Sequence, residues 1–185
     1  KGLECLWYLA HIENLKSFLE RGILSYERVR CSSIPYRSIA NPGVQARRQA
    51  RTNGIDLHNY VPLYMAWRNP MLWVVRNQPL AYIRVSLDAA DVEGVIFSDG
   101  NAASSDTSFY QEPYGVDSLP WDVILGRRWT GNRIVDGKRK RCAEVLVPDI
   151  VEIRFLGDML CNHPTEGLDV PSQFKHLLRC DPEFR

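Results

Sequence analysis

Alternating apolar and polar positions in the last third of the chain predict a strand with an acid inside it. Four basic residues, 138–141, lead into the segment 142–148, which ends at a proline. Strand side chains alternate between two faces: Ala143, Val145 and Val147 share one, and Cys142, Glu144 and Leu146 share the other. A carboxylate in such a strand is expected to pair with a cation, to cap a backbone N–H or to take part in catalysis, because burying it alone is costly or forces it to protonate. The simplest interpretation is that Glu144 pairs with a nearby arginine such as Arg141.

The same patterns along the rest of the chain predict more strands than helices. Strands are expected over residues 6–9, 57–65, 80–87, 92–97, 144–147 and 151–155, and helices over 12–21, 42–51, 70–75, 121–125 and 172–179. Pro62 restricts its strand to an edge or a bulge, because proline has no N–H for the ladder. The segments 25–38, 98–106 and 127–141 have little periodicity and predict loops. Strands and helices are not regularly interleaved, which indicates an α+β fold.

Composition indicates a single globular domain. The 185 residues are enough for one sizeable core, and 45% hydrophobic with 24% charged residues is ordinary for a soluble protein. The five cysteines are scattered and include no Cys-x-x-Cys pair, and no secretory signal or apolar run of transmembrane length is found. We therefore expect one cytoplasmic, monomeric domain over residues 1–185, with reduced thiols, no bound metal and no membrane partner.

Charge is placed unevenly along the chain, although the net charge is only +1. Basic residues crowd the segment 127–141, and Arg47, Arg48 and Arg51 lie together in a predicted helix. Arg48 comes four residues after Val44 and shares its helical face, so it is the arginine expected to point inward. Such clusters build a local anion site, whereas the net charge excludes a polybasic nucleic-acid coat. The alternative is that all three arginines are solvated.

The chemistry-bearing residues are few once the absent motifs are set aside. The chain has no Gly-x-Gly-x-x-Gly, P-loop, His-Glu-x-x-His, Gly-x-Ser-x-Gly or zinc-deaminase signature. What remains is an arginine on a helix, a tyrosine-rich strand, Trp129 in a basic loop and Glu144 at the start of a strand. Arginine holds pyrophosphate, tyrosine stacks on flat rings, and glutamate stabilises a reacting ribose. An aromatic residue in a basic loop suits single-stranded nucleic acid.

Several pieces of the sequence together have the order and spacing of a known family. They are the segments 11–15, 46–48, 57–64, 69–72, 95–102 and 140–147, with Trp129. With these pieces the chain resembles, over about residues 8–155, the DarT family of DNA ADP-ribosyltransferase toxins. The resemblance implies an ADP-ribosyltransferase-like fold: a split, mainly antiparallel sheet with surrounding helices and an NAD⁺ cleft. It also implies transfer of ADP-ribose from NAD⁺ to thymine or guanine in single-stranded DNA, and a macro-domain antitoxin that removes the mark.

The same resemblance assigns expected roles to individual residues. Glu144 falls on the catalytic glutamate, and Arg48 falls on the arginine that assists at the reacting base. The residues expected on the NAD⁺ side are Tyr8, Ala10, His11, Asn14, Tyr64, Met71 and Arg48. Those expected to contact DNA are Asn101, Trp129, Arg139, Lys140 and Arg141. Tyr8 stands where relatives carry a histidine, and the loop at 100–102 also lacks one, which indicates a different target base or a divergent branch.

Two other functions stay open on the sequence. One is an ADP-ribosyltransferase or NAD⁺ hydrolase that uses Glu144 on protein, RNA or water and does not need the basic loop. The other is a catalytically silent DNA-binding domain that keeps the fold. Full transfer to DNA after neutralisation of Arg139 and Arg141 would favour the first, and DNA binding without nicotinamide release would favour the second.

Overall fold

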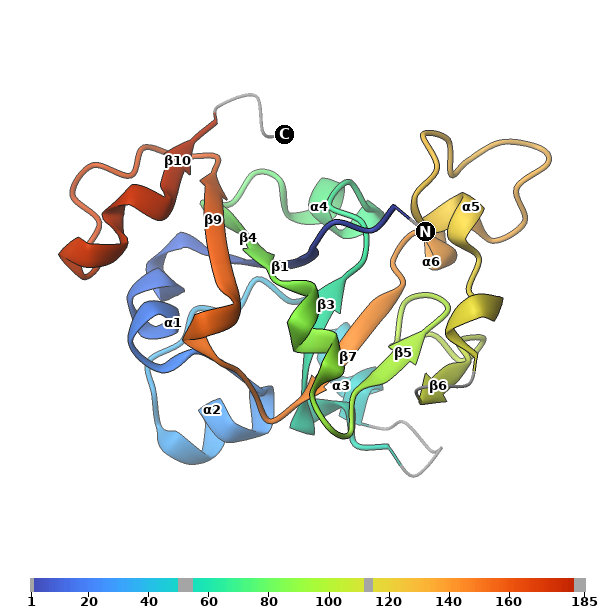
Figure 1. The fold of residues 1–185 in the computed structure, drawn as a ribbon, viewed down its shortest axis with the longest axis horizontal. Helices are drawn as coiled ribbons and strands as arrows, with labels where there is room; N and C mark the ends of the chain where they lie inside the picture. The colour runs from blue at the N-terminus through green and yellow to red at the C-terminus, as the bar shows by residue number, and fades with distance from the viewer. Residues whose placement is uncertain (1, 50–54, 112–114, 182–185) are drawn as a thin grey trace.

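The fold is built on one mixed sheet of eight strands (Figure 1). The structure is a computed structural model that describes residues 2–49, 55–111 and 115–181. In sheet order the strands are β10 (Leu178–Cys180), β9 (Leu156–Cys161), β4 (Leu80–Val85), β1 (Leu6–His11), β3 (Tyr60–Tyr64), β7 (Glu144–Pro148), β5 (Ile96–Ser98) and β6 (Phe109–Gln111). Neighbours are antiparallel except β9 and β10, which are parallel. A separate ribbon pairs β2 (Ile23–Leu24) with β8 (Ile150–Val151).

Short helices connect these strands. The α-helices are α1 (Leu15–Arg21), α2 (Tyr26–Ser32), α3 (Pro42–Gln49), α4 (Pro70–Val75), α5 (Trp121–Ile124) and α6 (Gly137–Lys140). The 3₁₀ turns are η1 (Ile12–Asn14), η2 (Leu57–Asn59), η3 (Leu87–Asp91), η4 (Val116–Ser118), η5 (Ile153–Phe155) and η6 (Ser172–Leu177). Asn69 caps α4, since its Oδ1 accepts the N–H groups of Met71 and Leu72. Gly22 ends α1 at a φ of 84°, which glycine adopts without strain. Both signals were predicted from the sequence.

The sheet splits between its two central strands. β1 and β3 meet at one register pair, Trp7 opposite Tyr64, whereas β3 pairs with β7 along its whole length. The N–H of Met65 donates to Ala143 O at 3.2 Å, so by alternation the nitrogen of Pro62 faces away from β7, toward β1. A missing N–H costs nothing on that unpaired side. The prediction that Pro62 marks an edge strand is therefore wrong, because β3 is central, and the proline lies where β1 and β3 diverge.

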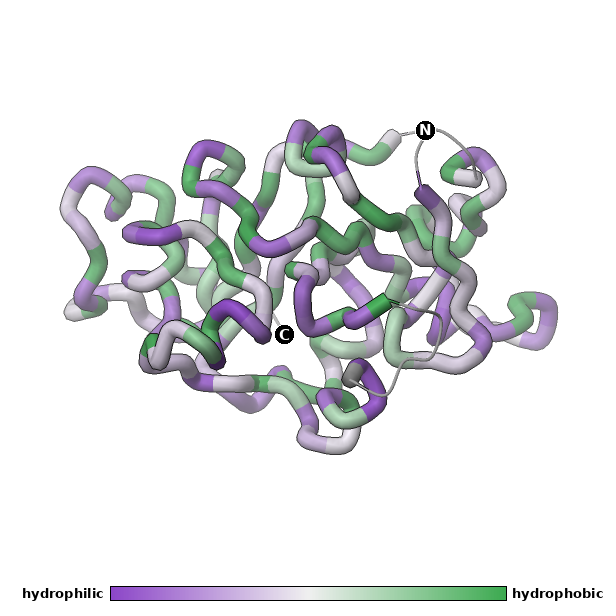
Figure 2. The backbone as a smooth tube through the Cα atoms, turned by 90° about the horizontal axis from the view of Figure 1, so that it is seen from below, coloured by the Kyte–Doolittle hydropathy of each residue, from purple (hydrophilic) through white to green (hydrophobic). Residues whose placement is uncertain are grey.

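The main core lies on one face of this sheet. Its members include Leu6, Ala10, Val61, Leu63, Ile83, Val85, Ala143, Val145 and Val147, with Phe18 and Leu19 from α1 packed against them. Leu146 instead joins a smaller cluster with Leu57, Ile96 and Ala102. The alternation predicted for β7 is thus confirmed, and it puts Glu144 on the face away from the main core. Figure 2 shows apolar and polar stretches following one another along the chain.

Several of the predicted elements need correction. The loop expected over 127–141 contains α6, and the strand expected over 57–65 begins with η2. The segment 25–38 contains α2, which buries none of its residues and so has no hydrophobic period; Ser25 caps it by accepting the N–H of Arg28. Of the strand expected over 151–155, only Val151 is in a strand, β8; residues 153–155 form η5, and the longer strand β9 begins at Leu156. The helix expected over 172–179 is η6 followed by β10, and the strand expected over 92–97 is confined to β5. The predicted end of the helix at 51, with its stop at 53–54, lies outside the described residues.

Candidate active site

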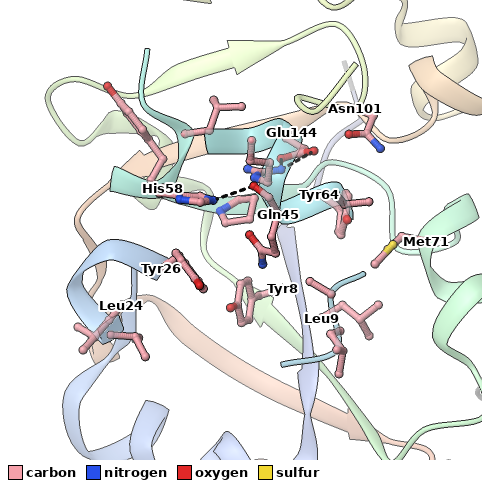
Figure 3. Close-up of a pocket in the computed structure, with 18 of the residues that line it drawn as sticks. Tyr8, Leu9, Leu24, Tyr26, Gln45, His58, Tyr64, Met71, Asn101 and Glu144 are labelled. Atoms are coloured by element: carbon pink, nitrogen blue, oxygen red, sulfur yellow. Dashed lines mark hydrogen bonds and ion pairs between the residues drawn. The ribbon is translucent and has the colours of Figure 1, made fainter. Parts of the chain in front are cut away.

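A cleft opens where β1 and β3 diverge (Figure 3). Counting its open mouth, it holds about 1010 Å³ of empty space. Side chains from β1, α2, α3, β3, α4 and β7 line it. Its aromatic lining consists of Tyr8, Tyr26, Tyr36, Tyr60, Tyr64 and His58. The cleft therefore offers flat apolar rings with polar tips, a surface that suits a ligand with planar groups.

An ion pair between Glu144 and Arg48 forms one wall of this cleft. Arg48 Nη1 lies 3.1 Å from Glu144 Oε2; the Glu144 side chain is buried at 2% exposed, and the Arg48 side chain is 11% exposed. The backbone N–H of Ala102 donates to Glu144 Oε1 at 3.1 Å. The N–H of Glu144 itself donates to Ser98 Oγ at 2.9 Å. The carboxylate is therefore fixed from two sides, and the interpretation that it pairs with Arg141 is wrong.

Arg48 has a donor left over in this arrangement. Among the described residues its Nη2 is a buried side-chain nitrogen without a hydrogen-bond partner. A buried guanidinium nitrogen in that state costs free energy unless something else accepts from it. Because Arg48 lines the cleft, an acceptor carried by a bound ligand would relieve this cost.

Burial keeps the cleft's central tyrosines neutral. It raises the pKa of Tyr8, and a hydrogen bond and charge interaction with Tyr36 raise it further. Burial also raises the pKa of Tyr64, and the nearby carboxylate of Glu144 adds to the shift. Both hydroxyls therefore remain protonated at neutral pH, where each has one hydrogen to donate.

His58 was not assigned a role from the sequence, yet it holds the helix that carries Arg48. Its Nε2 lies 3.2 Å from the backbone oxygen of Gln45, one turn before Arg48 on α3. Its ring lies 4.5 Å from that of Tyr26, which comes from the segment expected to be a loop. Figure 3 shows His58 and Gln45 joined by this contact beside Glu144. The available signal in the sequence was a histidine next to the tyrosine-rich segment 60–64.

Of the residues predicted on the NAD⁺ side, the structure brings Tyr8, Tyr64, Met71 and Arg48 to the cleft lining. Ala10 is fully buried in the main core. The side-chain amide of Asn14 exchanges two hydrogen bonds of 2.9 Å with the backbone of Arg37. His11 caps η1, since its Nδ1 accepts the N–H of Glu13 at 3.2 Å. These three residues are not part of the cleft lining in the described structure, and their contact with NAD⁺ stays a prediction.

The buried position of His11 predicts a loss of stability in mild acid. Its side chain accepts a hydrogen bond through Nδ1, and burial followed by the charge of Arg37 lowers its pKa. The unfolded chain then binds the proton more readily, so stability is full above the unfolded pKa of about 6.5 and falls as the pH drops through it. A cap is worth about 1 kcal/mol, and we expect a loss of that order, measured by urea unfolding at pH 7.5 and 5. His11→Asn keeps a capping side chain and should remove this part of the pH dependence; an unchanged pH dependence would contradict the assignment.

Arg141 is a structural residue and not a free cation of a basic loop. It is 8% exposed, and its guanidinium donates to four backbone oxygens: those of Arg68, Val123, Ile124 and Gly126. These oxygens belong to the segments before α4 and around α5, so the side chain ties three parts of the chain together. The prediction that Arg141 contacts DNA is corrected for this reason.

Arg141→Lys should therefore lower stability more than DNA binding. A lysine is too compact to reach the same oxygens, and buried acceptors are left unpaired. We expect the free energy of unfolding to fall by about 3 kcal/mol, whereas the exposed Arg128→Lys should change it by less than about 0.5 kcal/mol. Urea titration of the two variants measures this. Wild-type stability together with weakened DNA binding in Arg141→Lys would reinstate the original prediction.

The other residues predicted to contact DNA have different positions. Asn101 lines the cleft beside Glu144. Trp129 and Lys140 are half-buried and do not belong to the cleft lining in the described structure. Arg139 is also withdrawn from solvent, because its guanidinium lies between the carboxylates of Asp99 and Asp136. The basic segment is thus partly a packing element.

Within the described residues, no group of three or more histidine, cysteine, aspartate or glutamate side chains is arranged to hold a metal ion. No helix in the described part of the chain is long and apolar enough to cross a membrane.

Comparison with known proteins identifies relatives over nearly the whole chain. A family model described as "ssDNA thymidine ADP-ribosyltransferase, DarT" matches residues 7–177. A DNA ADP-ribosyl transferase–DNA ADP-ribosyl glycohydrolase fusion protein of Thermosipho africanus is 31% identical over 159 residues, which are 82% of this chain and 40% of the fusion. A DNA ADP-ribosyl transferase of Mycobacterium bovis is 30% identical over 84% of this chain and 75% of its own length. The chain thus spans less than half of the fusion protein.

Solved structures match the fold. The structure of Thermosipho africanus DarTG in complex with ADP-ribose has a TM-score of 0.80 at 27% identity, covering 98% of this chain and 50% of that one. Thermus sp. 2.9 DarT in complex with ADP-ribosylated ssDNA has a TM-score of 0.78 at 22% identity, covering 100% of this chain and 97% of that one. The predicted ADP-ribosyltransferase-like fold, with a mainly antiparallel sheet, is confirmed.

Proposed function

Because this chain belongs to the DarT family of DNA ADP-ribosyltransferases, we propose that it transfers ADP-ribose from NAD⁺ to a base in single-stranded DNA. The observation that carries the proposal is the buried pair of Glu144 and Arg48 at the wall of a tyrosine-lined cleft. A buried ion pair with one unsatisfied nitrogen contributes little to stability. Its free nitrogen can instead donate a hydrogen bond to a polar ligand. The family description names thymidine, so thymine is the first base to test.

The cleft residues fit the parts of NAD⁺. Tyr8 and Tyr64 offer rings for stacking, and Tyr64 also offers a protonated hydroxyl as a donor. Met71 supplies an adaptable apolar contact beside Tyr64, on the side where we place the nicotinamide. Glu144 then accepts a hydrogen bond from a ribose hydroxyl. Asn101, on the same stretch of cleft wall, and Trp129 are proposed to meet the DNA.

The proposed reaction is a substitution at C1′ of the nicotinamide ribose. The bond from C1′ to nicotinamide breaks, and nicotinamide leaves as a neutral molecule with the bonding electron pair. A nitrogen of the base supplies the electrons of the new C1′–N bond and loses its proton to solvent. Positive charge develops on the ribose in the transition state, and a fixed carboxylate beside the sugar stabilises that charge. Glu144 suits this role because the Arg48 side chain and the Ala102 amide fix its position.

Arg48 acts on the base without taking its proton. A guanidinium stays protonated at neutral pH, so it cannot serve as the general base. It stabilises the electron-rich base as the proton leaves, while its second contact keeps Glu144 oriented. Nη2, which lacks a protein partner among the described residues, is the nitrogen available for this contact.

One relative supports a proposal about the biological partner. The Thermosipho relative joins a DNA ADP-ribosyl transferase to a DNA ADP-ribosyl glycohydrolase in one chain. We propose that this protein is a toxin whose partner is such a glycohydrolase, a macro-domain antitoxin that removes the modification. Because NAD⁺ and DNA meet in the cytoplasm, we place the protein there.

The experiment that tests this function measures nicotinamide release and incorporation of labelled ADP-ribose. The acceptors are single-stranded oligonucleotides each rich in one base, a duplex of the same sequence, and buffer alone. The proposal predicts release coupled to label on a single-stranded acceptor. Release without labelled DNA would indicate a protein, RNA or water acceptor, and no release with retained DNA binding would indicate a silent binding domain.

A further inference from the structure

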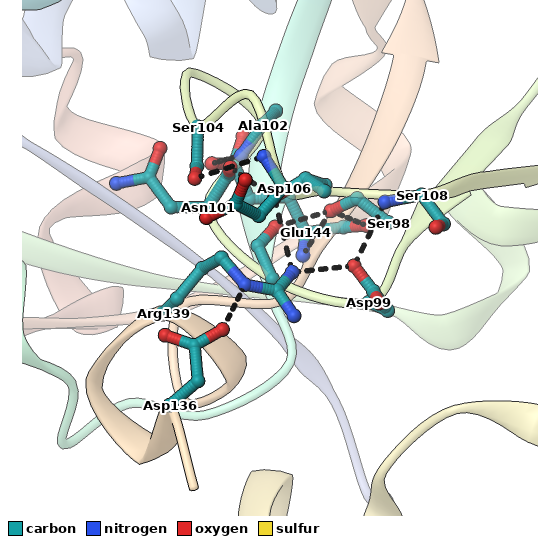
Figure 4. Close-up of polar contacts among 12 residues, drawn as sticks. Ser98, Asp99, Asn101, Ala102, Ser104, Asp106, Ser108, Asp136, Arg139 and Glu144 are labelled. Carbon is teal, nitrogen blue, oxygen red and sulfur yellow. Dashed lines mark hydrogen bonds and ion pairs between the residues drawn. The ribbon is translucent and has the colours of Figure 1, made fainter.

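The loop between β5 and β6 fixes the carboxylate of Glu144 (Figure 4). Ser98, at its start, accepts the N–H of Glu144 at 2.9 Å and donates to Gly100 O at 2.7 Å. Ala102, in its middle, donates its N–H to Glu144 Oε1 at 3.1 Å. The loop therefore sets both the backbone and the side chain of the proposed catalytic residue, opposite Arg48.

Arg139 holds this loop in shape from α6. Its Nη1 donates to Asp99 Oδ1 at 2.6 Å and to Thr107 Oγ1 at 3.1 Å, so one nitrogen joins the beginning and the end of the loop. Its backbone oxygen accepts the N–H of Asn101 at 3.0 Å, next to Ala102. Its Nε donates to Asp136, which orients the guanidinium. Figure 4 shows Arg139 between the two aspartates, with the loop around it.

The contact between Arg139 and the loop is close. A Cβ added at Gly100 would lie 2.5 Å from Arg139 Nη1 and 3.0 Å from its backbone oxygen. Any residue larger than glycine at this position would therefore push against Arg139. The Arg139 side chain is 11% exposed. Two carboxylates face one guanidinium here, so the local charge does not attract a phosphate. This position fits a clamp and not a DNA contact.

We propose that Arg139 is a positioning residue that, through Asp99 and the loop backbone, sets the Ala102 N–H on Glu144. Loosening the clamp lets the amide move off Oε1, and the carboxylate then loses one of the contacts that aim it at the ribose. A displacement of about 1 Å at a reacting group can cost about 100-fold in rate. The inference rests on the proposed function for its kinetic consequence, but the clamp itself is testable without any activity.

Two substitutions separate positioning from DNA contact. Arg139→Lys keeps the positive charge but loses the fork that reaches Asp99 and Asp136 together. Asp99→Asn removes an acid and leaves every cation in place. Positioning predicts that both lower kcat by about 10- to 100-fold at saturating NAD⁺ and oligonucleotide, with the KM for the oligonucleotide changed by less than about threefold. A DNA contact predicts near-wild-type kcat for both, and a KM that is unchanged or lower in Asp99→Asn.

Amide hydrogen exchange gives the readout that needs no turnover. The clamp predicts faster exchange at Ala102 in Arg139→Lys and Asp99→Asn, with unchanged exchange in β7. The control is Arg179→Ala, which removes an exposed arginine that pairs with Asp158 at 3.6 Å at the far edge of the sheet, and which should alter neither kcat nor exchange at Ala102.

The exchange rate at Ala102 and the kinetic constants together decide whether Arg139 is a positioning residue. Faster exchange at Ala102 with lower kcat supports the inference. If the variants exchange faster at Ala102 but the wild-type protein releases no nicotinamide, the clamp is supported and the proposed function is wrong. Unchanged exchange at Ala102, or a raised oligonucleotide KM at constant kcat, overturns the inference. If either substitution prevents folding, Thr107→Val takes its place with the same expected direction; it removes the 3.1 Å contact with Arg139 and the 2.6 Å hydrogen bond from Thr107 Oγ1 to Asn101 O.

Discussion

Glu144→Gln lowers the rate of ADP-ribose transfer by about 100- to 1000-fold while the protein stays folded. The amide has the size of the carboxylate, and its oxygen still accepts from the Ala102 N–H. What it lacks is the negative charge that stabilises the ribose as nicotinamide leaves. The loss therefore falls on kcat and not on the binding of NAD⁺.

Steady-state nicotinamide release and thermal unfolding of the same preparations measure this prediction. Glu152→Gln is the matched control, because Glu152 is an exposed glutamate whose pairing with Arg154 at 2.9 Å lies outside the cleft. It should transfer at the wild-type rate. Transfer by Glu144→Gln within a few-fold of wild type would remove the residue from the chemistry.

Arg48→Ala is expected to lose both activity and stability. It leaves Glu144, 1% exposed, without its cation, and breaking a buried pair from one side costs about 3 kcal/mol or more. The rate of transfer should fall by about 100-fold, because the same change removes the contact to the base and the orientation of the carboxylate.

Urea unfolding of a double-mutant cycle tests the coupling. Arg48→Ala/Glu144→Gln should be more stable than Arg48→Ala alone, since the uncompensated charge is gone. Arg47→Ala is the control, an exposed neighbour on α3 whose loss should change stability by less than about 0.5 kcal/mol. Additive effects of the two substitutions would mean that the ion pair does not couple these residues.

Local signals in the sequence predicted most of the central strands. β1, β4 and β7 have apolar patterns that survive in the structure as buried residues, and the cap at Asn69 is decided by its own side chain. α2 was missed because it has a cap but no buried residue, and hydrophobic period was the criterion. The prediction of an edge strand from Pro62 failed because the split between β1 and β3 depends on the register of three strands. The sequence of one strand does not contain that register.

The site was predicted in outline for a related reason. Strand alternation put Glu144 away from the main core, and helical spacing put Arg48 on the same face as Val44; both lie at the cleft. The run 138–141 predicted exposed cations, whereas Arg139 and Arg141 donate to carboxylates and backbone oxygens from other parts of the chain. Sequence spacing shows that charges are neighbours, but the acceptors that bury them come from the tertiary fold.

Mass spectrometry of one oligonucleotide tests the central claim most directly. A single-stranded oligonucleotide with one thymidine is incubated with NAD⁺ and either wild-type protein or Glu144→Gln, and fragmentation locates any adduct. We expect one ADP-ribose on the thymidine with the wild type and none with the variant over the same time. An unmodified oligonucleotide in the presence of free nicotinamide, or equal modification by both proteins, would contradict the account.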